Sequence, residues 1–140
     1  MITKKELTGM MRTQTEIALA TSVNGQPHVR IVNFYFDATA NTLFFTTFGD
    51  NDKVKEFEAN PQVAFTTIPH HGYEHVKANG IVKKSDRTIF DVADGFTSKI
   101  PDYQDTIEQA GEQLVLYEIK FDTAVVTLDF EHMDTICLEG

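Results

Sequence analysis

Several residue types are scarce in this chain of 140 residues. Cys137 is the only cysteine, so the chain has no internal disulfide and no cluster of cysteine-ligated metal. Lys and Arg together number 12 against 21 Asp and Glu, which gives a net charge of −9. Nucleic-acid binding needs a basic surface, so this balance argues against a nucleic-acid partner. It still allows a single phosphate held by two or three cations.

Long apolar runs are also missing. No stretch is apolar enough to span a bilayer, and the polar start at residues 1–5 is unlike a secretory signal. We therefore expect no membrane partner and a cytoplasmic location. The length fits a single domain over residues 1–140, and contents of 41% hydrophobic and 24% charged residues are typical of globular proteins.

Short segments with period-two alternation make up most of the chain. Asn24-Gly25 is a strong hairpin signal, because both central positions of that turn favour positive φ. Thr3 and Glu6 have the spacing of a capping box at the start of a helix. The other helices are expected at residues 53–59 and, as two short pieces, within 86–110. The expected strands cover residues 17–22, 28–36, 42–48, 62–68, 73–84, 113–121 and 124–130, with the last segment extending toward 138.

About six to seven antiparallel strands with short connections predict a mainly β fold with peripheral helices, a closed or nearly closed barrel. The strands at 28–36 and 42–48 are apolar on both faces, whereas a free-standing barrel strand should have one polar face. A second copy of the chain covering the outer face would explain this pattern. We therefore expect a homodimer.

Arg30 is the most informative charged residue. Alternation places it on the same face as Val32, Phe34 and Phe36, and a guanidinium is costly to bury without an anion. One interpretation is a structural ion pair with an acid brought near by folding, such as Glu16 or Glu118. The other is a phosphate, because Thr46, Thr47 and the helix that opens at Lys53 would supply hydroxyls and an ammonium.

Six short motifs follow one another in a familiar order and spacing. They are ALAT at 18–21, NGQP at 24–27, HVRIV at 28–32, LFFTT at 43–47, KV at 53–54 and NPQV at 60–63. This ordered set resembles the pyridoxamine 5′-phosphate oxidase-like family, the FMN-binding split barrels, over nearly the whole first half of the chain.

The resemblance implies a dimeric split barrel with FMN at the subunit interface. It implies that Arg30 and Lys53 hold the phosphate and that Thr46 or Thr47 donates to phosphate or ribityl oxygens. Alternation forbids both threonines from pointing to the ligand. The backbone of Ile31, Val32 and Asn33 would border the isoalloxazine ring. The second subunit would contribute residues of its fourth and fifth strands, among them Thr66, Thr67 and Lys77.

Two departures separate the chain from the oxidase proper. Tyr35 replaces a basic residue late in the second strand, and no Arg-x-His segment follows Phe130. We therefore expect an FMN-dependent oxidoreductase of unknown substrate and not a true pyridoxamine phosphate oxidase. Its partners would be a second copy and a small-molecule redox substrate, and no catalytic side chain can be named.

Three alternatives remain open at this stage. One is a flavin-binding or flavin-storing protein without turnover, and another is a deazaflavin in place of FMN. The third is haem binding or degradation, because some distant split-barrel relatives use histidine near the iron. His70, His71 and His75 invite that hypothesis, although exposed histidines without a metal are the simpler interpretation.

Overall fold

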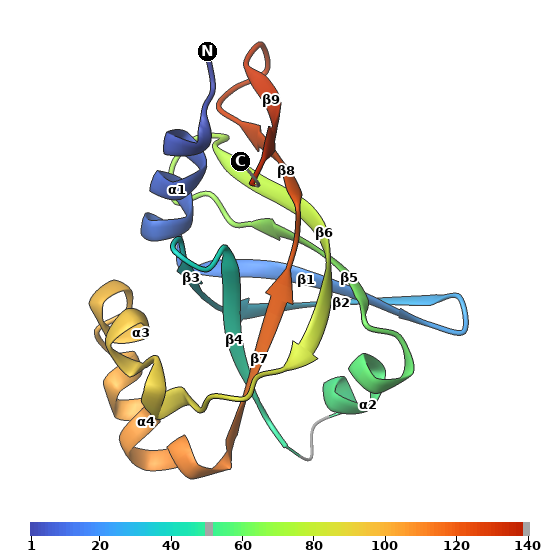
Figure 1. Ribbon diagram of the computed structural model, residues 1–140, viewed down its shortest axis with the longest axis vertical. Helices are drawn as coiled ribbons and strands as arrows, with labels where there is room; N and C mark the ends of the chain where they lie inside the picture. Colours follow the sequence, from blue (N-terminus) through green and yellow to red (C-terminus); the bar gives the residue numbers. More distant parts are fainter. Residues whose placement is uncertain (50–51, 139–140) are drawn as a thin grey trace.

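The computed structural model of the protein describes residues 1–49 and 52–138, and it contains a single antiparallel sheet that curls into a partly open barrel (Figure 1). The sheet follows the order β2-β1-β5-β6-β7-β4-β3, with β8 pairing to β6 and β9 to β8. The strands are β1 (Glu16–Val23), β2 (Gln26–Asn33), β3 (Tyr35–Asp37), β4 (Thr42–Phe48), β5 (Gln62–Thr67), β6 (His75–Lys84), β7 (Leu114–Lys120), β8 (Thr123–Thr127) and β9 (Met133–Cys137). The predicted fold class, mainly β with short helices, is confirmed.

The strands number nine, whereas six to seven were expected, because two predicted segments are divided. The segment at 28–36 is interrupted at Phe34, whose backbone N–H donates to the Thr15 carbonyl at 3.1 Å. The C-terminal segment turns back on itself to give β8 and β9. Since β2 and β3 lie at opposite ends of the strand order, the chain at Phe34 links the two edges of the sheet.

Local sequence signals account for the first elements. Helix α1 (Lys4–Thr13) begins at a complete capping box, in which the Thr3 N–H donates to the Glu6 carboxylate at 2.7 Å. The β1–β2 hairpin turns at Asn24 and Gly25, whose φ values are 52° and 80°. Both features are as predicted.

Close strand packing explains one glycine of β6. A Cβ on Gly80 would lie 2.6 Å from the Lys120 carbonyl oxygen of β7, so only glycine fits this approach. The strand continues through Gly80, pairing first with β5 and then with β7.

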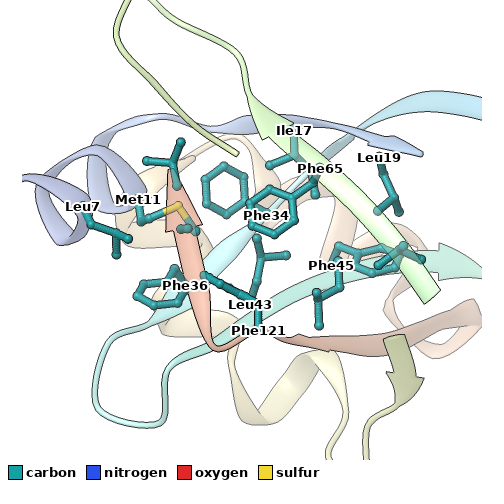
Figure 2. Close-up of a cluster of buried hydrophobic side chains, with 14 of the residues drawn as sticks. Leu7, Met11, Ile17, Leu19, Phe34, Phe36, Leu43, Phe45, Phe65 and Phe121 are labelled. Atoms are coloured by element: carbon teal, nitrogen blue, oxygen red, sulfur yellow. The ribbon is translucent and has the colours of Figure 1, made fainter. Parts of the chain in front are cut away.

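The main core fills the barrel and extends under α1 (Figure 2). Phe34 and Phe45 are fully buried in it. A second, smaller core lies between β4, β7 and the helices α3 (Ala93–Lys99) and α4 (Tyr103–Ala110). Short 3₁₀ turns, η1 (Ile89–Asp91) and η2 (Gly111–Gln113), flank these two helices.

The second core corrects one part of the sequence interpretation. Phe44 on the outer face of β4 is covered by the chain's own α3–α4 segment and not by a second copy. The outer face of β2 stays open, with Val29 70% and Ile31 61% exposed. Among the described residues, no helix is long and apolar enough to cross a lipid bilayer.

Candidate functional site

Arg30 lies at the centre of a polar cluster formed with β1 and the helix that follows β4. It extends from β2 on the same side as buried Val32, as alternation predicted. Its Nη1 donates to the Thr21 hydroxyl at 2.9 Å and, more weakly, to the Leu19 carbonyl at 3.5 Å. Its Nη2 forms an ion pair with Glu56 of helix α2 (Asp52–Ala59).

The partner acid differs from both acids that the sequence suggested. Glu118 receives a hydrogen bond from Ser85 at 2.8 Å, and Glu16 is exposed at the start of β1. Glu56 was missed because it is 26 residues from Arg30 in the sequence and belongs to another element. Only the docking of α2 against β1 brings the two side chains together.

The Arg30–Glu56 pair is largely withdrawn from water. The two side chains are 16% and 17% exposed, and the Thr21 hydroxyl also donates to Glu56 Oε1 at 2.5 Å. Burial raises the pKa of Glu56, but the hydrogen bonds from Thr21 and Arg30 and the charge of Arg30 outweigh it. The pKa of Glu56 therefore lies below its usual value, and the carboxylate is charged at neutral pH.

The guanidinium nevertheless keeps capacity for a further anion. Arginine carries five N–H donors. The bonds to Leu19, Thr21 and Glu56 use three of them, and the remaining two have no acceptor among the groups that the structure describes, which leave out the side chains of residues 50–53. Arg30 is thus held in place by protein groups without being saturated by them.

Lys53 belongs to the same helix as Glu56, three residues earlier and in the first turn of α2. Its side chain lies outside the described part of the structure. Arg30 therefore contacts the helix that carries Lys53, and the predicted convergence of the two cations on one phosphate stays a prediction.

The two threonines of β4 face opposite sides, as alternation required. Thr46 points to the second core, where its hydroxyl bonds that of Tyr103 at 2.5 Å. Thr47 points into the barrel, the face to which Arg30 also belongs. Thr47 is 4% exposed, and its Oγ1 has no hydrogen-bond partner among the described residues. Of the two, Thr47 is the one with a free hydroxyl.

The segment of Ile31, Val32 and Asn33 forms an edge of the sheet. In the described residues β2 pairs only with β1, so alternate backbone N–H and C=O groups of β2 face no strand. Ile31 and Asn33 point outward, and Val32 points into the core. Unpaired main-chain groups are therefore available along this segment.

The outer face of β1, β5 and β6 is hollowed. Ala18, Ala20 and Ala64 present only methyl groups there and line a hollow of about 590 Å³. Ala20 and Ala64 also line a second hollow of about 710 Å³. Lys77 and Thr66 border the same face.

Thr67 points the other way from Thr66. It is 1% exposed, and its hydroxyl accepts the Val76 N–H at 2.8 Å. Of the predicted fourth- and fifth-strand residues, Thr66 and Lys77 thus share an open surface and Thr67 does not.

The three histidines near the β5–β6 turn do not converge. His70 contacts the Thr15 hydroxyl at 3.2 Å, His75 contacts the Tyr73 carbonyl at 2.8 Å, and His71 is exposed. In the described part of the chain, no three His, Cys, Asp or Glu side chains are grouped to hold a metal ion.

Sequence reasoning also missed a half-buried lysine. Lys99, in the last turn of α3, donates to the Met11 carbonyl at 3.0 Å and lies 3.4 Å from the centroid of the Phe34 ring. The sequence offered no signal for it, because a lysine at the end of a helix is ordinarily solvated.

These features define a class of protein: a small, partly open antiparallel barrel with a half-buried arginine on the strand that forms a free sheet edge. A family model described as pyridoxamine 5′-phosphate oxidase-like matches residues 10–132. The chain belongs to this family. No curated protein sequence matches it.

Solved structures agree on the fold. The haem storage protein HutZ of Vibrio cholerae is 15% identical, with 94% of this chain and 100% of that chain covered and a TM-score of 0.71. A FAD-binding protein of Mesorhizobium loti is 18% identical, with coverage of 88% and 90% and a TM-score of 0.65. A pyridoxamine 5′-phosphate oxidase-like protein of Listeria innocua is 15% identical, with coverage of 88% and 96% and a TM-score of 0.67. At these identities the likeness extends to the fold alone.

Proposed function

We propose that this protein binds FMN and acts as a small flavin-dependent oxidoreductase. The observation that carries the proposal is Arg30, a guanidinium held by β1 and α2 with two N–H donors that no described group accepts. A phosphate ester suits the planar guanidinium well, since charge-assisted hydrogen bonds from arginine to phosphate oxygens are strong and directional.

Other residues fit the remaining parts of the cofactor. The orphaned Thr47 hydroxyl is a donor for a phosphate or ribityl oxygen. The free edge of β2 at Ile31, Val32 and Asn33 offers main-chain groups to the polar rim of the ring. Lys53, at the start of α2, would add a second cation. Flavin supplies the redox chemistry when bound, and the chain supplies position and access.

The hollowed outer face supports a homodimer as part of the same proposal. Exposed Val29 and Ile31 border it, and the alanines of β1 and β5 allow another sheet to approach closely. Lys77 and Thr66 would then reach the cofactor of the other copy. We expect Ile31→Glu to convert the dimer to a monomer in light-scattering measurements, whereas Lys84→Glu, an exposed site on β6, should not.

The flavin site is tested by titrating the protein with FMN and with riboflavin, which lacks the phosphate. Arg30→Gln should weaken FMN binding about 10- to 100-fold, the loss of one or two charge-assisted bonds, and leave riboflavin binding unchanged. Glu56→Gln should do the opposite and tighten FMN binding, because it removes a negative charge beside the phosphate. Equal FMN affinity in all three proteins would refute the phosphate role of Arg30.

Turnover is tested separately. The FMN-loaded protein should consume reduced nicotinamide cofactor in the presence of an acceptor, and the flavin-free protein should not. Tight FMN binding without consumption would identify a flavin carrier. A Soret band on addition of haemin, reduced by replacing His70, His71 and His75, would instead favour haem, the ligand named for the HutZ structure.

A further inference from the structure

A separate cavity of about 560 Å³ lies between α1, β3 and α3. None of Arg30, Thr46 and Thr47 lines it, so it is distinct from the proposed phosphate site. Its polar lining is provided by Thr8, Arg12, Tyr35, Asp37, Thr39, Ser98 and Lys99.

Lys99 is the unusual member of this lining. Its amine donates one hydrogen bond, to the Met11 carbonyl, and faces the ring of fully buried Phe34. No carboxylate lies within 4.0 Å of it in the described part of the chain, and two of its three ammonium donors have no acceptor there. A methionine would fill the same space without the cost of desolvating a charge.

The neighbouring charges do not compensate for that burial. Asp37 on β3 uses one carboxylate oxygen to accept the N–H groups of Thr39 and Ala40, at 3.0 and 3.2 Å. Arg12 on α1 adds a second positive charge, and Asp94 on α3 is exposed. Burial lowers the pKa of Lys99 to about 7, well below its ordinary value of 10.5.

Arg12 also lines the cavity, so its guanidinium is available to an anion bound there. It is exposed, and none of the described carboxylates lies within 4.0 Å of its guanidinium. A guanidinium and an amine that line one cavity match a compound that carries both a carboxylate and a carbonyl group.

We propose that this cavity binds a small oxo acid, with Lys99 forming an imine at its carbonyl carbon and Arg12 holding its carboxylate. The lone pair of the neutral amine forms the new C–N bond to the carbonyl carbon. Both amine hydrogens leave with the carbonyl oxygen as water, and the product is the C=N bond. No electrons are exchanged in this step, so no oxidant or reductant is needed.

Reductive trapping at neutral pH tests the proposal. The parent protein is incubated with glyoxylate and cyanoborohydride, which reduces an imine to a stable secondary amine, and the modified lysines are mapped by peptide mass spectrometry. Lys99 should be carboxymethylated about tenfold or more faster than exposed Lys84, because the cavity holds the probe beside an amine whose pKa burial has lowered. Labelling spread over the lysines according to their exposure would overturn the proposal.

Two variants and a second probe separate the parts of the site. Lys99→Arg keeps the positive charge but cannot form the imine, so labelling at this position should vanish while circular dichroism shows an intact fold.

Arg12→Gln should slow trapping of glyoxylate at Lys99 but not that of glycolaldehyde, which has no carboxylate. Equal effects on both probes, or none on either, would refute the role of Arg12. Arg30→Gln should leave the labelling unchanged, which keeps this test independent of the flavin proposal.

Discussion

The buried amine of Lys99 predicts a specific pH dependence of stability. Burial lowers its pKa in the folded protein to about 7, from an ordinary value of 10.5 that applies to the unfolded chain. Between these two values the unfolded chain binds more protons at this site than the folded protein does. The free energy of unfolding contributed by Lys99 therefore rises as pH increases through this window.

The magnitude follows from the size of the window. Each pH unit within it changes the free energy of unfolding by up to about 1.4 kcal/mol. Lys99→Met removes the group, so the variant should be more stable than the parent near neutral pH, where the parent must bury an ammonium or release its proton. That advantage should shrink by about 2–3 kcal/mol between about pH 7.5 and about pH 9.5.

Urea denaturation of the two proteins at several pH values measures this difference directly. The two proteins should have the same slope of unfolding free energy against urea concentration, so that they differ only in the urea concentration at the midpoint of unfolding. Lys84→Met is the matched control, and its difference from the parent should be flat, because Lys84 is exposed. A constant difference between Lys99→Met and the parent across the range would show that the amine is not desolvated.

Three further predictions concern other parts of the fold. Thr47→Val should raise the free energy of unfolding by up to about 1 kcal/mol, measured by thermal denaturation, because it removes a buried hydroxyl that has no partner among the described residues; a decrease would mean that the hydroxyl is bonded. Gly95→Ala should lower the free energy of unfolding by about 1–2 kcal/mol despite its better helix propensity, since the new Cβ would lie 2.4 Å from the Tyr35 ring; Tyr35→Ala should suppress the effect in the double variant. The stability that Glu56 contributes should be present above its unfolded pKa of about 4.5 and disappear as pH falls through its lower folded value, so parent and Glu56→Gln should converge in acid when followed by circular dichroism.

Features encoded by neighbouring residues could be predicted from the sequence. The hairpin at Asn24-Gly25 and the capping box of α1 each depend on a few adjacent side chains. Alternation along one strand was enough to place Thr46 and Thr47 on opposite faces. The alternation along β2 also predicted correctly that the Arg30 side chain points inward.

Features that depend on distant segments could not be predicted. The break at Phe34 is invisible in an unbroken apolar run, because its cause is the closing of the sheet, with a bond to Thr15. Phe44 is covered by α3 and α4, which follow it by about fifty residues in the sequence. The apolar outer face of its strand therefore suggested a second copy of the chain, although a later segment of the same chain covers it. Glu56 and Lys99 acquire their environments only from helices that dock on other elements.

The pairing of β4 with β7 has a consequence for synthesis on the ribosome. Thr42 pairs with Lys120 and Phe48 with Leu114, so β4 emerges from the exit tunnel long before its neighbour exists. Until β7 has been synthesised, β4 can pair only with β3, and its other edge stays unpaired. Pairings between strands this distant in sequence also form slowly. The nascent chain should therefore depend on chaperones until residue 120 has been released, and a stalled shorter chain should be prone to aggregate.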